Sequence, residues 1–210
     1  MKREAFIALW SMLAIQLIWI VYNRTHGNAP LNEWVWPFVI TSGAVAVTRG
    51  RIAWLGTFPR IIIALDFLLA VADRLGFFGG PGTPGVGWGD FAHFTAYTAK
   101  VNSFLPLGMI PSIAVIATIA ETTLGITMLL GLYSRFAAAG SAVLLTMFAT
   151  AMWISGLSHM LYAVYLMAAG AWVLATMEPS PLSVDALLAR WSHRAREASP
   201  ATGNSARQIQ

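Results

Sequence analysis

The chain has 210 residues, of which 57% are hydrophobic and only 10% are charged. A soluble domain carries about 25% charged residues because polar side chains must cover its surface, so this composition excludes an ordinary soluble protein. The sequence contains no cysteine, which excludes disulfides, thiol catalysis, Fe–S ligation and cysteine zinc sites. The net charge of +4 lies mostly near expected helix ends and in the tail. This pattern favours contact with the anionic headgroups of a lipid bilayer over nucleic-acid binding.

Six apolar stretches come close to the roughly 20 residues that a helix needs to cross a bilayer. In chain order they cover residues 5–22, 34–48, 61–78, 107–133, 136–155 and 160–177. The second is the weakest, because it is short and contains Pro37. The expected fold class is all-α: a polytopic membrane helix bundle of about six transmembrane helices.

Charges in the loops indicate the orientation of these spans. With the N-terminus inside, six spans place most basic residues on the cytoplasmic side, as the positive-inside rule requires. Besides Lys2 and Arg3 before the first span, that side holds Arg49, Arg51, Arg60, Arg135, Arg190, Arg194 and Arg196. Both termini are therefore expected in the cytoplasm. The first stretch follows Lys2 and Arg3 as a signal peptide would, but no small-residue cleavage site follows it, which favours a retained signal-anchor.

The segments outside the spans have distinct compositions. Residues 79–89 are too rich in glycine and proline for a helix. Asp90 is expected to cap a short helix that runs to about Asn102. This helix is expected either to lie on the outer surface as a lid or to form part of an ordinary interfacial loop. In the tail, residues 182–191 are typical of an amphipathic helix at the cytoplasmic interface, and the chain from about residue 197 is polar and expected to be disordered.

Ionisable groups inside spans are costly, so each is a candidate functional residue. Asp66 and Glu121 lie on neighbouring antiparallel spans, each about 18 Å from the outer surface at 1.5 Å per residue. They are the candidate catalytic residues, as a pair that holds a proton on a quinone or proton pathway. Glu121 could instead form a structural hydrogen bond to a neighbouring helix.

Four further residues are candidates for binding a substrate or a headgroup. Asp73 and Arg74 are adjacent near the end of the third span, where we expect an ion pair with each other or contact with headgroups. Arg135 follows the fourth span. His159 borders the sixth span, as a proton relay or as an ordinary interfacial histidine. No metal site is expected, and the two intramembrane imidazoles of a membrane haem are missing.

Three motifs between Arg60 and Asp185 resemble the DoxX family of bacterial membrane proteins. The first motif is the third span, which starts at Arg60 and ends with Ala72-Asp73-Arg74-Leu75-Gly76. The second runs from Glu121 to Arg135 and ends with Gly131-Leu-Tyr-Ser-Arg135. The third is Pro181-Leu-Ser-Val-Asp185. In the first motif alanine and arginine replace the family's usual glycine and lysine. The resemblance implies a four-helix core at residues 59–178, preceded by a two-span extension at 1–58 and followed by a tail at 179–210. It also implies a bacterial inner-membrane location and a role beside quinone-linked or sulfur-compound oxidoreductases.

Three functions are compatible with these observations. The first is a membrane subunit for quinone-linked oxidoreduction, with no cofactor of its own beyond a bound quinone, working with redox partner subunits or as a homo-oligomer. Glu121 and Asp66 would then handle protons, while Arg74 or Arg135 would orient an anionic group. The second is a small-solute or proton transporter, although no inverted repeat is visible. The third is a non-catalytic scaffold or assembly factor.

Overall fold

The computed structural model describes residues 2–26, 35–157 and 161–198, excluding the side chains of residue 193 and residues 195–198. The regular secondary structure of these parts is helical, and they contain no strand. The helices are α1 (Lys2–Thr25), α2 (Val35–Val47), α3 (Thr57–Arg74), α4 (Phe91–Val101), α5 (Ile110–Leu130), α6 (Ser134–Ile154), α7 (Leu161–Thr176) and α8 (Val184–Ala198). Short 3-10 turns precede α3 at Ala53–Gly56 and α5 at Leu107–Met109.

Four segments are long and apolar enough to cross a membrane: Lys2–Thr25, Ala53–Arg74, Leu107–Leu130 and Ser134–Ile154. The expectation of a polytopic helical membrane protein is therefore confirmed. The other two expected spans are also apolar helices, but α2 has 13 residues and α7 has 16, fewer than the roughly 20 that cross a bilayer. Both adjoin residues outside the described parts, so a count of six spans stays a prediction.

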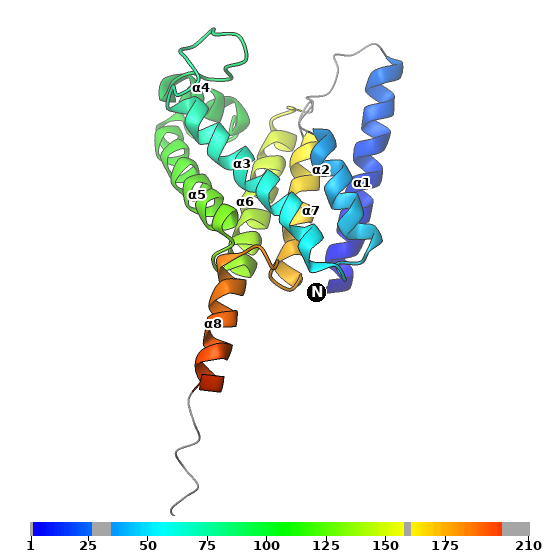
Figure 1. The fold of residues 1–210 in the computed structure, drawn as a ribbon. Coiled ribbons are helices and arrows are strands. Elements are labelled where there is room, and N and C mark those ends of the chain that lie inside the picture. The colour runs from blue at the N-terminus through cyan, green and yellow to red at the C-terminus, as the bar shows by residue number, and fades with distance from the viewer. Residues whose placement is uncertain (1, 27–34, 158–160, 199–210) are drawn as a thin grey trace, which may run out of the picture.

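The helices form one bundle, which Figure 1 shows from the side. Helix α5 packs against α3 and α6, and α7 packs against α6, α3 and α1. Helix α2 contacts α1, α3 and α7, so the two N-terminal helices cover one side of the other spans. The N-terminus and α8 lie at one end of the bundle, here called the α8 end, and α4 lies at the opposite end, the α4 end (Figure 1).

Small residues let α3 and α5 approach closely where they cross. A Cβ added to Gly125 would lie 2.9 Å from the side chain of Leu68, and Ala64 and Ala117 are buried. Lipid tails are as apolar as leucine, so packing of small residues is a main source of helix association in a bilayer. This close packing holds in place the middle of α3 and the middle of α5, where Asp66 and Glu121 lie.

Two helices end earlier than their apolar stretches indicate. Helix α3 ends at Arg74 rather than at residue 78, because Gly76 adopts a φ of 79° and Phe77 N donates back to Ala72 O. Helix α5 ends at Leu130 rather than at residue 133, because Gly131 has a φ of 67° and Leu132 N donates to Thr127 O. Both are left-handed glycine caps, which stop a helix whatever the hydrophobicity of the residues that follow.

The tail is tied to the bundle at the α8 end. Arg60, on α3, donates to Met128 O, to Leu129 O at 3.0 Å and to Leu182 O at 2.8 Å, so it caps the end of α5 and holds the chain that leads into α8. Asp185 accepts from Tyr133 N at 2.8 Å and Ser134 N at 2.7 Å, the first amides of α6. Beyond this anchor α8 continues away from the bundle (Figure 1) and is longer than the expected helix at 182–191.

Candidate functional site

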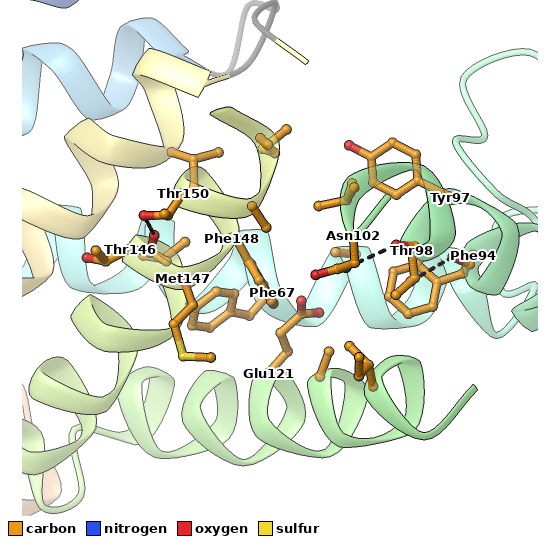
Figure 2. Close-up of a pocket in the computed structure, with 18 of the residues that line it drawn as sticks. Phe67, Phe94, Tyr97, Thr98, Asn102, Glu121, Thr146, Met147, Phe148 and Thr150 are labelled. Carbon is orange, nitrogen blue, oxygen red and sulfur yellow. Dashed lines mark hydrogen bonds between the residues drawn. The ribbon is translucent and has the colours of Figure 1, made fainter. Parts of the chain in front are cut away.

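A cavity of about 560 Å³ lies between α3, α4, α5 and α6. Its walls are mainly apolar and aromatic, with Phe67 from α3, Phe94 from α4 and Phe148 from α6 (Figure 2). Met147 and Ile154 also line it, and their side chains are 62% and 56% exposed on the outer face of the bundle. The cavity is therefore continuous with the surface that would face lipid. Its size falls within the range of about 300–1,000 Å³ that is usual for small-molecule sites.

Polar side chains from four helices line this cavity, and they include Arg74, Thr98, Thr146 and Thr150 as well as the four described next. Asp66 lies on α3, Glu121 on α5, and Tyr97 and Asn102 lie on or just after α4. In Figure 2 the carboxyl group of Glu121 points toward the side of the cavity that Asn102 lines. The Tyr97 hydroxyl has no hydrogen-bond partner among the described residues, and burial raises the pKa of Tyr97, which keeps this group a donor at neutral pH.

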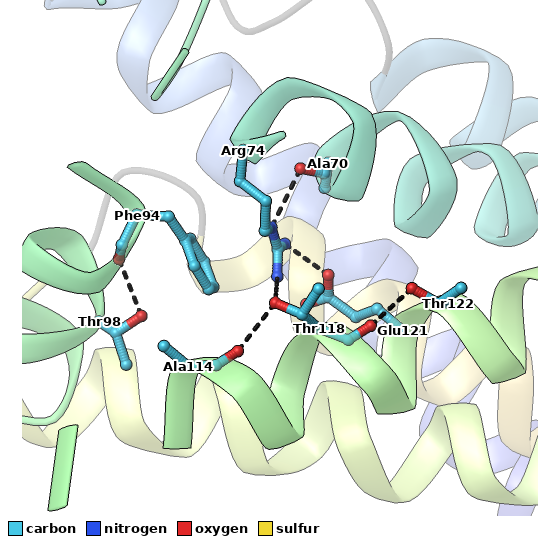
Figure 3. A network of polar contacts seen from close by, with 8 residues as sticks. All are labelled: Ala70, Arg74, Phe94, Thr98, Ala114, Thr118, Glu121 and Thr122. Carbon is cyan, nitrogen blue, oxygen red and sulfur yellow. Dashed lines mark hydrogen bonds and ion pairs between the residues drawn. The ribbon is translucent and has the colours of Figure 1, made fainter. Parts of the chain in front are cut away.

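Glu121 forms a buried ion pair with Arg74. The Arg74 Nη2 lies 2.5 Å from Glu121 Oε2, and the two residues are 1% and 4% exposed. Nη1 of the same guanidinium donates to Thr118 Oγ1 at 3.0 Å, and Nε donates to Ala70 O at 3.1 Å (Figure 3). A buried charge needs an opposite charge and hydrogen bonds to offset its lost hydration, and Arg74 has both.

Aromatic rings cover the Arg74 side of this pair. The guanidinium carbon lies 3.7 Å from the centroid of the Phe94 ring and 5.3 Å from that of Trp88. Phe94 belongs to α4, whose first turn is capped by Asp90, as expected: Asp90 Oδ1 accepts from His93 N at 2.8 Å. A cation over a ring face is attracted electrostatically. Helix α4 thus forms one wall of the cavity and also encloses the ion pair.

The expected ion pair between Asp73 and Arg74 is wrong, and neither residue faces headgroups, because both are buried. Adjacent residues on a helix point in directions about 100° apart and do not face each other. Asp73 Oδ2 instead accepts from Gly87 N at 3.0 Å and Trp88 N at 2.9 Å. It therefore ties the glycine-rich loop to the end of α3 and holds Trp88 near Arg74.

Asp66 differs from the two buried carboxylates, Asp73 and Glu121. Its side chain is exposed to the cavity, and it makes no hydrogen bond or ion pair with the described residues. Asp66 and Glu121 line the same cavity, but Glu121 is held by Arg74 while Asp66 has no such partner. Glu121 therefore makes the contact to a neighbouring helix that was its structural alternative, and the proton-holding pair with Asp66 stays a prediction.

The remaining candidates lie elsewhere. Arg135 is exposed at the α8 end, where its Nε donates to Ala175 O at 3.2 Å, away from the cavity. His159 lies outside the described residues. Within the described parts of the chain, no group of three histidine, aspartate or glutamate side chains could hold a metal ion.

Sequence reasoning missed most of the cavity wall. Phe94 and Thr98 lie four residues apart, a helical spacing, but nothing in the sequence connects them with Phe67 and Phe148 on other helices. No sequence pattern identifies Tyr97 and Asn102 as cavity residues either. The Asp90 cap and the helical spacing that follows it were the one usable signal, because they identify α4 as an ordered element.

The chain was compared with known protein families, curated proteins and solved structures. Residues 91–200 match the sequence profile described as TQO small subunit DoxD, which covers 110 of the 210 residues. The matched part runs from the start of α4 through α8, and α1, α2 and α3 precede it. No curated protein and no solved structure matches the chain. Because more than half of the chain fits the profile, in agreement with the DoxX-like motifs in its sequence, this protein belongs to the DoxX-like family of the TQO small subunit DoxD.

Proposed function

We propose that the protein is the membrane subunit of a quinone-linked oxidoreductase and that its cavity binds the quinone ring. The observation that carries the proposal is an unpaired carboxylate, Asp66, in an aromatic cavity that is open to the lipid-facing surface. Flat apolar rings pack well against aromatic side chains, and a lipid-soluble ligand would enter from the bilayer. The family description names a small subunit, which supports a role within a complex.

The polar groups of the cavity have separate roles in this proposal. Reduction of a quinone to a quinol consumes two electrons and two protons. A partner subunit would supply the electrons, in keeping with a family description that names a small subunit. Asp66, in its protonated form, would give one proton to a ring oxygen, to which Tyr97 would donate a hydrogen bond, and the second proton would come from water. Glu121 is held in an ion pair by Arg74 at 2.5 Å, so it would line the cavity without exchanging protons.

The test is direct binding of a ring compound to the purified full-length protein. Small molecules that co-purify would be identified by mass spectrometry, and a short-chain quinone analogue would be titrated into the protein in nanodiscs. We expect saturable binding that survives Asp66→Asn, while quinone reduction by the assembled complex falls about 100-fold or more, the usual contribution of a positioned proton-transfer group. The control is Glu178→Gln, an exposed carboxylate at the α8 end.

Two results would contradict the proposal. One is a protein that carries no ring compound and binds no analogue. The other is unchanged quinone reduction in Asp66→Asn. Proton flux in vesicles without a redox partner would favour the transporter instead, and neither activity would favour a scaffold.

The orientation of the chain belongs to the same proposal. We place the α8 end, with both termini, on the cytoplasmic side of a bacterial inner membrane. Arg49, Arg51, Arg135 and Arg190 all lie at that end, as the positive-inside rule requires. Because the chain has no cysteine, single cysteines at Ser192 and Thr83 would report the two sides by labelling with a membrane-impermeant reagent. Labelling of Ser192→Cys in intact cells would contradict the orientation.

A further inference from the structure

A second hollow lies on the outer face of the bundle, between α1, α6 and α7. It is a groove of about 580 Å³, and six alanines form much of its wall: Ala8, Ala139, Ala142, Ala168, Ala169 and Ala175. Alanine side chains are short, so a run of them on three adjoining helices leaves a depression where larger residues would fill the space. Ala139 and Val143 are exposed, so the groove is open toward the bilayer.

The groove and the cavity meet at α6. Thr146 and Met147 line both hollows. Both side chains are exposed, so they form a low ridge on the outer surface and do not separate the two spaces by a buried wall. Met147 is unbranched and flexible, and methionine adapts to the shape of what lies against it. A ligand in the cavity could therefore extend over this ridge without any change in the helices.

We propose that the groove holds the polyisoprenoid tail of the lipid whose ring occupies the cavity. This inference rests on the proposed function and adds the class of quinone, one with a long tail. It also assigns a role to the N-terminal helix, because Ala8 and Met12 of α1 form part of the groove. Helix α1 lies outside the region that matches the family profile, so it extends the binding site of the matched helices.

The dimensions of the groove favour a chain over a partner helix. From Ala139 to Met147 the groove follows about 12 Å of α6 at 1.5 Å per residue. A transmembrane partner would pack along much more of the roughly 30 Å hydrocarbon thickness. The groove also starts beside the cavity and runs toward the α8 end, so it can receive a tail that leaves the cavity at Met147.

The energetic contribution of such a groove is limited. A tail in the groove is no better shielded from water than a tail in lipid, so burial of apolar surface contributes nothing and only packing favours the groove. We therefore expect the protein to prefer a long-tailed quinone over a short-chain analogue by about three- to tenfold, which corresponds to about 0.7–1.4 kcal/mol.

The experiment compares tail lengths in nanodiscs that contain the full-length protein. Affinity would be expressed against the mole fraction of quinone in the bilayer, so that partitioning into lipid cancels. Ala8→Phe and Ala142→Phe would fill the groove from two different helices. The matched control is Ala14→Phe, an exposed alanine of the same helix as Ala8 that does not line the groove. The unfolding midpoint of each variant would show that it is folded.

The expected result is that Ala8→Phe and Ala142→Phe lose the preference for the long tail but bind the short-chain analogue as the wild type does, while Ala14→Phe keeps the preference. Absence of any tail-length preference in the wild type would overturn the inference and indicate that bilayer lipid fills the groove. A preference that survives in both groove variants would overturn it as well. Failure of the wild type to bind the short-chain analogue is a separate result, since it refutes the quinone site itself.

Discussion

Breaking the ion pair between Arg74 and Glu121 should strongly destabilise the protein. Two unit charges about 4 Å apart attract each other by about 4 kcal/mol at an effective dielectric constant of 20. Removing one partner of a buried pair costs about 3–5 kcal/mol, because the other charge stays buried without compensation. Glu121→Ala would leave the guanidinium with the hydroxyl of Thr118, the carbonyl of Ala70 and the Phe94 ring. We therefore expect a loss of about 3 kcal/mol, at the lower end of that range.

The two single variants should differ in a defined way. An unpaired carboxylic acid can take up a proton and lose its charge, whereas a guanidinium cannot. Arg74→Met should therefore cost less than Glu121→Ala, even though it also loses the contact with the Phe94 ring. The double variant Arg74→Met with Glu121→Leu should recover most of the stability, because an apolar replacement of similar volume leaves no buried charge.

The assay is the free energy of unfolding in mixed micelles, followed by tryptophan fluorescence and by helical circular dichroism. A double-mutant cycle would give the coupling energy of the pair, which we expect to be about 2 kcal/mol or more. Glu178→Gln, which removes an exposed carboxylate, should change stability by less than about 0.5 kcal/mol. Single variants that each cost under about 1 kcal/mol, or that add within about 0.5 kcal/mol, would refute the reasoning.

Three further predictions concern residues that hold loops and helix ends. Asp73→Ala removes the acceptor for two loop amides and should speed hydrogen exchange at residues 79–89; exchange that stays as slow as in the wild type would show that other contacts hold the loop. Gly131→Ala should lower the free energy of unfolding by about 1–3 kcal/mol and with it the unfolding midpoint. The reason is that φ is 67° and the new Cβ would lie 2.5 Å from Ser183 Cβ. An unchanged midpoint would contradict the close contact. Burial raises the pKa of Asp185, but hydrogen bonds from the start of α6 outweigh it and leave that pKa below its ordinary value. The ionised cap therefore stabilises the fold above about pH 4, and its contribution is lost as the pH falls through the lowered pKa. Asp185→Asn should reduce stability by about 1 kcal/mol at neutral pH, because hydrogen bonds to a charged acceptor are stronger than those to a neutral one, and by less in acid. A difference independent of pH would contradict this assignment.

The DoxX-like motifs of the sequence acquire a physical role in the structure. Gly131 needs a left-handed conformation and close contact with Ser183, and Asp185 caps the helix that starts at Ser134. Arg60, on α3, donates to the carbonyls of Met128 and Leu129 at the end of α5. These residues therefore hold the α8 end of the bundle together, at a distance from the cavity that lies toward α4.

The sequence by itself determined the class of protein, because 57% hydrophobic and 10% charged residues can be buried only in a bilayer. It also determined most helix positions, since hydrophobic length and the Asp90 cap are local signals. It brought Asp66 and Glu121 to the same depth, because helical rise converts residue number into distance along the span.

Only the tertiary structure decided which groups meet. Arg74 pairs with a residue 47 positions away and not with its neighbour Asp73, and Asp73 holds amides 14 and 15 positions further along the chain. Depth in the membrane is read from the residue number, but the direction of a side chain around its helix and the partner on the next helix depend on how the helices rotate and cross. The cavity and the groove depend on the same packing, because they are the spaces that these crossings leave between side chains.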